Sequence, residues 1–564
     1  QLSVWDPVRQ FGVSNPAVIV NEVEGNNVLY NTMVNLGLSF DFTPELQLRG
    51  LFGINYDYNR EKMFIPGVST DALIPLEGGR ARNMIRNGAG KSMSYYGNVT
   101  LSYQHGFQKG HYLSAMAGVQ MLFRDRLYEY AKGINTATDY DRNLSSVKDA
   151  FGKYLDGYDD KWKWFNIFAN VEYNYKKQLY AGVSLSADAA SVTGERSDVF
   201  NLYPAANIAW KLNNSSFLRE SDFVNDLTIR AEYSMKGNSM LPAMISKYHY
   251  VAMDYKEMGG IVRGNIPNDK LKPELVVSTN VGVDFRTLGN KLNLSLDLYN
   301  NETRDMLVQE DLGSSYGSKF RYINAGKMET KGIEVGINAT VIRTGGFEWN
   351  LGATIAHEKA EIKDLGGRDA IVTTLSDGAQ IITRVGESPY AFYGLKTNGV
   401  YATSAEASAD NLVDFRGENF RAGDLRYVNA DASDRVIDSK DKMIIGDPTP
   451  DFYGGIFTSF RYKNYTLSAQ FTYSYGNDVY NAVRRVGESM VDFAGQTRAV
   501  KNSWNYEGHQ TTVPKAEYGD PMNNSQFSSR WIEDGSYLKL KNLTFNYEYP
   551  SKLWIFRSFQ AYVS

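Results

Sequence analysis

The chain of 564 residues contains no cysteine, few prolines and only five histidines. The lack of cysteine excludes a disulfide framework, a cysteine zinc site and a thiol nucleophile. None of the histidines has HExxH or HxH spacing, so a zinc hydrolase centre is not expected. No apolar run reaches the roughly 18 residues of a transmembrane helix. The formal charge of −4 provides no basic surface for nucleic acid. These absences exclude an α-helical membrane protein and leave a β-barrel membrane protein open.

The sequence does contain an alternation of apolar and polar residues with a period of two, which is typical of β-strands. The alternation is clear in 30–42, 46–58, 165–175 and 179–188. About sixteen such segments occur, most of them about ten residues long, which is the length that a tilted transmembrane strand needs. Tyrosines gather at segment ends, as in the interfacial girdles of membrane barrels. Examples are Tyr56, Tyr58, Tyr173, Tyr175, Tyr473 and Tyr475.

The connections between these segments alternate in length. Short turns are expected near 43–45, 105–111, 176–178, 287–290, 344–346 and 462–464. Long polar stretches are expected at 60–91, 124–161, 236–272, 301–329, 361–390, 402–449 and 476–535. Outer-membrane barrels have short periplasmic turns and long extracellular loops, so the alternation also predicts the orientation.

A soluble all-β protein, such as a propeller or a stacked sandwich, also has alternating strands. The inward face of such a fold is a packed core, whereas the second face here carries Asn, Asp, Glu, Arg and Ser in mid-strand. Those residues suit a water-filled lumen, and no blade-type repeat occurs. The prediction is therefore an all-β fold: a large transmembrane antiparallel β-barrel with long extracellular loops and short periplasmic turns.

Two motifs could carry chemistry, and neither is complete. Gly313–Gly317 matches GxSxG but lies in a polar loop without the strand-turn-helix context of a nucleophile, so no enzyme activity is predicted. In the acidic stretch 429–441, Asp434, Asp438 and Asp441 fall on the fifth, ninth and twelfth positions of a calcium loop. Alanines and an arginine occupy its early ligand and turn-glycine positions. We predict a degenerate loop and no cofactor, with retained calcium as the less favoured alternative.

A series of sequence stretches keeps a fixed order and spacing across 202–550. They are LYPAANIAWKL (202–212), NDLTIRAEYSMKGN (225–238), LKPELVVSTNVGVDF (271–285), LNLSLDLYNNETRDML (292–307), INAGKMETKGIEVGIN (323–338), GESPYAFYGLKTNGVY (386–401), GDLRY (423–427), IIGDPTPDFYGGI (444–456), SYGNDVYN (474–481) and RWIEDGSYLKLKNLTFNYEYP (530–550). In this order they resemble the SusC/RagA group of TonB-dependent outer-membrane transporters of Bacteroidota. That family commonly has a DxNGDGxIDxxD loop where this chain has 430–441, so the family's calcium site is in doubt here.

The resemblance implies a barrel of about 22 strands whose lumen holds an N-terminal plug. It also implies residence in the outer membrane among lipid, a periplasmic contact of the plug with TonB, and a SusD-like surface lipoprotein as a lid. On this basis residues 1–564 are interpreted as an incomplete TonB-dependent receptor-like barrel. The plug and a closing strand are expected outside this sequence, because an open sheet edge in lipid leaves backbone groups unpaired.

The family resemblance also directs attention to aromatic residues in the long loops, because rings hold sugars and peptide groups by stacking and hydrogen bonding. The candidate substrate-binding residues are Tyr248, Tyr250, Tyr390, Phe392, Tyr393, Trp504 and Tyr506. The competing interpretation is that these rings pack the loops together or contact the lid. The sequence does not separate a glycan binder from a peptide binder.

Three functions fit the sequence to different degrees. The first is active import of large nutrients, oligosaccharides or peptides, with a SusD-like lid and energy from TonB. The second is a SusC-like barrel that acts as a structural subunit of a larger outer-membrane complex. A passive porin fits less well, because porins have no need of so many long loops.

Overall fold

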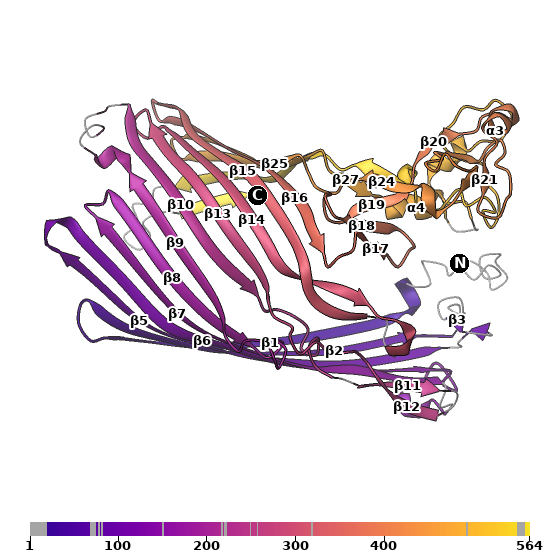
Figure 1. Cartoon of the computed structure of the whole chain (residues 1–564), viewed down its shortest axis with the longest axis horizontal. Helices are drawn as coiled ribbons and strands as arrows, with labels where there is room; N and C mark the ends of the chain where they lie inside the picture. The colour runs from indigo at the N-terminus through magenta and orange to yellow at the C-terminus, as the bar shows by residue number, and fades with distance from the viewer. Residues whose placement is uncertain are drawn as a thin grey trace.

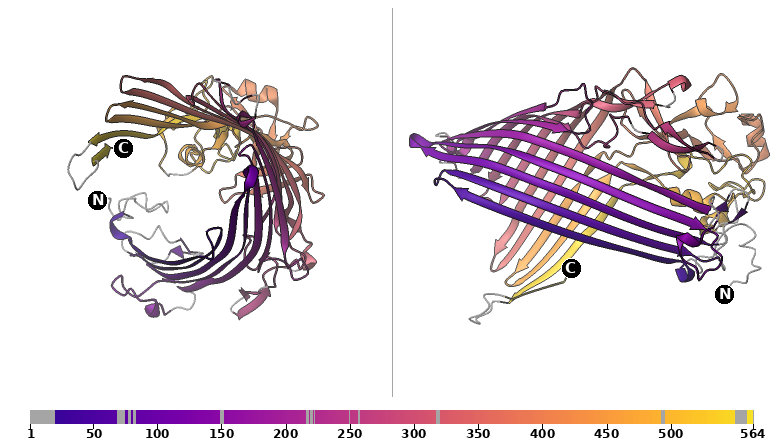
Figure 2. Two further views of the ribbon diagram at one scale, coloured as in Figure 1. Left: turned by 90° about the vertical axis from the view of Figure 1, so that its left-hand side faces the viewer. Right: turned by 90° about the horizontal axis from the view of Figure 1, so that it is seen from below.

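The computed structural model describes residues 20–67, 75–76, 79–80, 83–148, 152–215, 218, 221, 223–248, 250–255, 258–316, 320–491, 495–549 and 559–563. Sixteen of the strands form one antiparallel sheet, in which each strand pairs with its neighbours in chain order. The sheet curves round as the wall of a barrel, with β1 and β30 at its two ends (Figure 1, Figure 2). The described residues thus contain about sixteen wall strands, as predicted. No helix within the described residues is both long enough and apolar enough to cross a membrane.

The wall strands are β1 (Glu24–Asp41), β2 (Leu46–Ile65), β5 (Met84–Phe107), β6 (His111–Ile134), β7 (Lys153–Tyr175), β8 (Leu179–Ala190), β9 (Asn201–Lys211), β10 (Val224–Asn238), β13 (Glu274–Thr287), β14 (Leu292–Asp311), β15 (Phe320–Thr344), β16 (Phe347–Leu365), β25 (Phe452–Tyr462), β26 (Tyr465–Tyr475), β29 (Tyr537–Tyr549) and β30 (Phe559–Val563).

The register of the strands separates two faces, because directly paired residues point to the same side of a sheet. One row joins Val99, Val119, Ile167 and Ala187 across β5 to β8. The adjacent row joins Asn98, Gln120, Asn166 and Asp188. Val119 and Ile167 keep 39% and 46% of their surface exposed, unlike the residues of a soluble core. In a membrane barrel the apolar face contacts lipid and the polar face lines the lumen. We call them the lipid face and the lumen face.

Strands β8, β9, β25 and β26 have 11 or 12 residues, close to the predicted length of about ten, but many of the other wall strands are much longer. Strands β5 and β6 have 24 residues each, β7 has 23 and β15 has 25. The predicted long loop at 301–329 is therefore wrong over most of its length, and wall strands also take up both ends of the predicted loops at 60–91 and 124–161, whose middle parts are connections as predicted. Beyond the apolar belt both faces are polar, so the alternation disappears from the sequence while the backbone ladder continues. Asp125 paired with Lys161 on the lipid face illustrates this.

The short turns lie at one end of the strands, as predicted. Lys176 and Lys177 between β7 and β8 both have positive φ, at 51° and 53°. Gly345 and Gly346 between β15 and β16 have φ values of 55° and 84°. Two consecutive residues with positive φ form a type I′ turn, whose twist matches that of the flanking strands.

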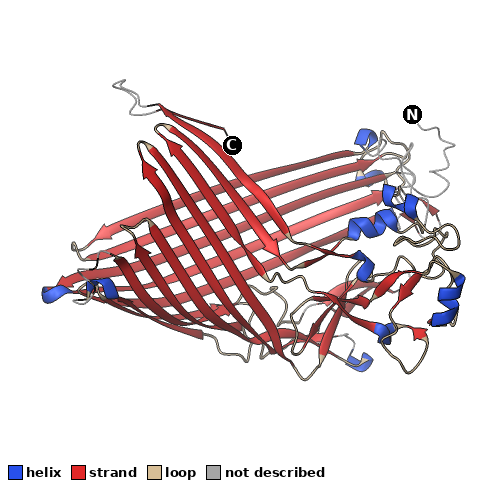
Figure 3. Ribbon diagram, turned by 90° about the horizontal axis from the view of Figure 1, so that it is seen from above, coloured by secondary structure: helices blue, strands red, loops and turns tan. Residues whose placement is uncertain are grey.

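The long connections gather at the other end, where most of the helices also lie (Figure 3). The β10–β13 connection carries the hairpin β11 (Tyr250–Tyr255) and β12 (Met258–Arg263). The β2–β5 connection carries β3 (Pro75–Leu76) and β4 (Gly79–Arg80). Between β14 and β15 the GxSxG stretch contains one 3₁₀ turn, Ser314–Tyr316; its Gly317 lies outside the described residues.

The two longest connections, 366–451 and 476–536, form what we call the loop domain, on the right of Figure 1. Its elements are β17 (Ala370–Thr374), β18 (Gln380–Arg384), β19 (Ala391–Leu395), β20 (Thr397–Val400), α3 (Ser404–Asp410), β21 (Val413–Asp414), β22 (Leu425–Tyr427), β23 (Val436–Ile437), β24 (Lys442–Gly446), β27 (Asp478–Tyr480), α4 (Ala482–Glu488) and β28 (Ile532–Asp534).

Candidate functional site in the lumen and the loop domain

Arg230 of β10 is the centre of a charged cluster on the lumen face. Its guanidinium crosses Gly282 of β13 and donates two hydrogen bonds of 2.6 Å to Asp297 of β14. Its Nε also donates to Asp284 at 3.0 Å. Gly282 leaves room for this crossing, because a Cβ at this position would lie 2.5 Å from Arg230 Cζ. Such a bidentate pair is strong and directional, so it fixes the side chain flat against the wall.

Tyr299 of β14 lies flat in the same way. Its ring crosses Gly332 of β15, and its hydroxyl donates to Glu358 of β16 at 3.1 Å. A Cβ on Gly332 would lie only 2.2 Å from Tyr299 Cζ. Tyr128 and Gly88 repeat the arrangement between β6 and β5, where a Cβ on the glycine would lie 2.9 Å from the tyrosine hydroxyl. Opposed glycines therefore let long polar side chains cover the wall without projecting across the lumen.

This lumen surface presents amide, carboxylate, guanidinium and phenol groups at fixed positions. Asn280 adds a hydrogen bond of 3.1 Å to Asp297, so the acidic group is held by both amide and guanidinium donors. Arg230 is paired with Asp297 and Asp284 within the surface, and Glu358 accepts from the Tyr299 hydroxyl, so charged and neutral hydrogen-bonding groups lie side by side. Such a surface suits the passage of a large, polar, hydrogen-bonding solute.

The two connections of the loop domain share one hydrophobic core. Its buried members are Leu395, Tyr401, Ala407, Phe420, Leu425, Tyr427, Ile437 and Met522. The fully buried Asp424 also joins the two connections, because it accepts hydrogen bonds from Asn524 Nδ2 at 3.0 Å and lies 3.2 Å from Lys515 Nζ. The loop domain is therefore a folded unit and not a set of independent loops.

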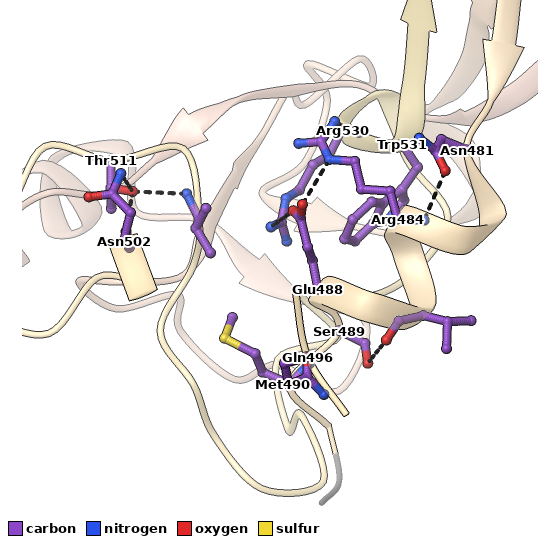
Figure 4. A network of polar contacts seen from close by, with 12 residues as sticks. Asn481, Arg484, Glu488, Ser489, Met490, Gln496, Asn502, Thr511, Arg530 and Trp531 are labelled. Carbon is purple, nitrogen blue, oxygen red and sulfur yellow. Dashed lines mark hydrogen bonds and ion pairs between the residues drawn. The ribbon is translucent and has the colours of Figure 1, made fainter. Parts of the chain in front are cut away.

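An ion-pair network holds helix α4 against the start of β28 (Figure 4). Arg530 Nη2 lies 3.2 Å from Glu488 Oε2, and Arg484 Nε lies 3.2 Å from the other oxygen of Glu488. Arg484 also reaches Glu533 at 2.7 Å. The guanidinium of Arg530 lies 4.3 Å above the ring of Trp531, which is fully buried. Arg484 and Arg530 thus share the buried carboxylate of Glu488 beside the ring of Trp531.

Burial shapes the charges of this network. It lowers the pKa of Arg530 to about 10, because burial disfavours the cation more than Glu488 favours it. Hydrogen bonds from Asn481 and Arg484 lower the pKa of Glu533. The Nε and Nη1 groups of Arg530 are buried and have no hydrogen-bond partner among the described residues. Glu488 is accordingly the main counter-charge that keeps Arg530 in place.

Three of the predicted aromatic residues lie in β19 of the loop domain or just before it. Tyr390 is 63% exposed and has a φ of +63°. Phe392 and Tyr393 are half-buried in β19 and pair with β24. Substrate contact by these residues stays a prediction.

The other predicted aromatic residues lie in two places. Trp504 belongs to the loop domain, where its indole N–H donates to Ala402 O at 3.0 Å. Tyr506 is exposed and stacks on His509 with ring centroids 4.9 Å apart. Tyr248 and Tyr250 are exposed beside and within the β11–β12 hairpin. The structure thus brings five of the seven residues into the loop domain and places two on a separate hairpin.

The acidic loop 429–441 closes on itself through hydrogen bonds. The fully buried Asp441 carboxylate accepts from the backbone N–H groups of Ala430, Asp431 and Asp438, at 2.8, 3.1 and 2.8 Å. Asp438 in turn accepts from Lys440 N. Calcium needs several free oxygen ligands, whereas Asp441, at the twelfth position, is already occupied by amide donors.

A lysine supplies positive charge within the same loop. Lys440 Nζ lies 3.8 Å from Asp431 and 4.0 Å from Asp434. No group of three His, Asp or Glu side chains able to hold a metal is found in the described part of the chain. The residues present do not fit a calcium ion, and the predicted lack of calcium stays a prediction.

The sequence reasoning missed the Arg230 cluster and the Arg530 network. Arg230 and Asp297 lie in mid-strand on polar faces, which predicted lumen lining but not their pairing. A glycine opposite Arg230 on the next strand is the signal that could have revealed this pairing, but it can be recognised only when the strand register is known. Arg530 and Glu488 lie 42 residues apart with no local motif between them.

Comparison with known proteins agrees with this architecture. The chain matches the family described as TonB dependent receptor-like, beta-barrel, over residues 5–563. A TonB-dependent receptor of Formosa agariphila is 26% identical over 550 residues, covering 95% of this chain and 54% of the relative. The TonB-dependent receptor SusC of Bacteroides thetaiotaomicron is 23% identical, covering 98% of this chain and 52% of the relative.

Solved structures give the same fold. The RagAB peptide importer in its open-open state has a TM-score of 0.79 and 19% identity, covering 98% of this chain and 58% of that chain. The chain spans about half the length of the curated relatives that it matches. Since these relatives are outer-membrane proteins and the family match covers nearly every residue, the predicted outer-membrane location is confirmed, and the chain belongs to the TonB-dependent receptor β-barrel family.

Proposed function

We propose that the chain forms the wall and outer loops of a SusC-like transporter that imports large polar nutrients across the outer membrane. The observation that carries the proposal is the lumen surface on a family barrel. Arg230, Tyr299 and their partners lie flat on the wall, so polar groups face the passage without narrowing it. A structural subunit has no need of such a surface.

Energy for import would come from TonB through a plug in the barrel, in keeping with the named activity of the relatives. A SusD-like lipoprotein would cover the loop end and hold the substrate together with the barrel. The loop domain supports this, because its shared core and its buried Asp424 give a partner a folded surface to contact.

The substrate is proposed to be an oligosaccharide or a peptide. Both are long chains of hydrogen-bonding groups. These groups can form hydrogen bonds in succession with the charged groups, amides and phenols of the lumen. The aromatic residues Tyr390, Phe392 and Tyr393 in and beside β19, with Trp504 and Tyr506 elsewhere in the loop domain, would provide stacking surfaces at the entrance.

Uptake by cells that lack the chromosomal gene tests the proposal. The full-length gene would be restored in strains with and without TonB, and labelled oligosaccharides and peptides would be supplied separately. We expect TonB-dependent uptake of one class and co-purification of a lipoprotein with the barrel. Normal assembly of an outer-membrane complex without uptake of either class would instead support the structural role.

A further inference from the structure

The lipid face carries a band of charged side chains on β14, β15 and β16, where its apolar rows end. The last row with apolar residues contains Leu298 and Ile333, with His357 beside them on β16. The next row toward the loop end consists of Asn300, Lys331 and Lys359, followed by Glu302, Glu329 and Glu361. Residues two apart in a strand share a face, so these are successive rows of one surface.

The band has more positive than negative groups. Its cations are Arg304, Lys327, Lys331, Lys359 and Lys363, against the three glutamates of the middle row and Asp364, which pairs with Lys327 in the register. Each glutamate is already neutralised by a neighbouring cation. The distances are 2.8 Å for Glu302–Arg304, 3.0 Å for Glu329–Lys331 and 2.7 Å for Glu361–Lys363. The excess charge is therefore positive.

Lys331 and Lys359 concentrate this excess at the edge of the apolar surface. They are directly opposite each other in the register, and both are exposed. Lys359 forms no ion pair within 4.0 Å among the residues that the structure describes, whereas Lys331 shares Glu329 with Lys363. Like charges directly opposite on neighbouring strands destabilise a sheet unless a counter-ion lies between them. Glu329 offsets the charge of Lys331, so the pair leaves the charge of Lys359 for an anion from outside the described chain to offset.

We propose that this band binds the phosphate groups of anionic lipid in the outer leaflet of the membrane. Its position selects a lipid, because the two lysines follow directly after the apolar row of Leu298 and Ile333. Lysine stems lie along apolar surface while the ammonium reaches the headgroup level. Lysine is also a common binder of phosphate as a point charge. The proposal concerns the outside of the barrel and is independent of the transported substrate.

Native mass spectrometry of the full-length protein in non-ionic detergent tests this proposal. Lipid A would be the phosphorylated probe and phosphatidylcholine the comparison. We expect the wild type to retain lipid A selectively, and Lys331→Gln with Lys359→Gln to weaken binding about 30-fold. The matched control removes two lysines at the opposite rim, Lys176→Gln with Lys177→Gln, and should bind lipid A as the wild type does.

A second double variant distinguishes loss of positive charge from misfolding of the barrel. Lys331→Arg with Lys359→Arg keeps both charges and should retain lipid A, and heat-dependent gel migration should show a folded barrel for every variant. Equal losses in the glutamine variant and in its control would overturn the proposal, since only net charge would then matter. Unchanged lipid binding in the glutamine variant would also overturn it. The proposal would also be overturned if the glutamine variant lost a co-purifying protein and kept its lipid A.

Discussion

Replacing Gly332 by alanine is expected to displace Tyr299 from the lumen wall. The added Cβ would lie 2.2 Å from Cζ and 2.3 Å from the hydroxyl oxygen of Tyr299. Carbon atoms in contact lie about 3.5 to 4 Å apart. Strand β15 is paired on both sides and cannot retreat, so the ring must move toward the lumen. The ring then loses its 3.1 Å hydrogen bond to Glu358.

The expected cost follows from these two losses. Overpacking a filled site costs about 1 to 3 kcal/mol, and a hydrogen bond to a charged group contributes about 1.5 to 3 kcal/mol. Part of the second is regained when water hydrates Glu358 in the lumen. We therefore expect Gly332→Ala to reduce the free energy of unfolding by about 2 to 3 kcal/mol.

Urea unfolding of the full-length barrel in phospholipid vesicles, followed by tryptophan fluorescence, measures this cost. A double-mutant cycle makes the test specific, because Gly332→Ala should cost less than about 0.5 kcal/mol once Tyr299 is already alanine. Gly25→Ala is the matched control, since a Cβ there meets no atom within 4 Å. An equal cost of Gly332→Ala in both backgrounds would refute the idea that Gly332 exists to accommodate Tyr299.

Three further predictions concern the loop domain. Glu488→Gln should destabilise it by about 3 to 5 kcal/mol, because a buried Arg530 loses its counter-charge, and faster proteolysis of the loop domain would show this. Adding calcium or a chelator should leave the melting temperature unchanged, whereas Asp441→Ala should lower it by freeing three buried amides; a calcium-dependent rise would contradict the assignment. Burial opposes ionisation of Asp414, but the amides of Glu418 and Arg416 and the Arg416 guanidinium outweigh it and lower its pKa. Its stabilisation is therefore present above the unfolded pKa of about 3.9 and is lost as the pH falls through the lower folded value, so Asp414→Asn should flatten the acid limb of loop-domain unfolding measured by hydrogen exchange.

The sequence predicted the parts of the fold that depend on local alternation. Strands such as 165–175 and 179–188 were recognisable because lipid on one face and water on the other impose a strict period of two. Their turn at Lys176 and Lys177 was also predicted, because the alternation stops there and restarts. Strand length was not predictable, since the extensions around Asp125 and Lys161 have water on both faces and no alternation.

The candidate site was less accessible, because its geometry depends on register between strands. Arg230 meets Asp297 only because β13 separates their strands and has Gly282 between them. A shift of one residue in either pairing would turn Arg230 toward a different neighbour. The loop domain poses the same difficulty over longer separations, as Asp424 and Asn524 are 100 residues apart.

The glycines of the lumen face link its polar surface to the register of the wall. A barrel that passes large solutes needs polar side chains on its lumen face, yet long side chains pointing inward would occupy the passage. Gly282 and Gly332 resolve this conflict, because each removes a Cβ where a neighbouring side chain must cross the wall. The polar group of the crossing side chain then forms a hydrogen bond to the strand beyond the glycine, and this links three strands. The same contacts that hold these side chains flat against the wall therefore also fix the register of the wall.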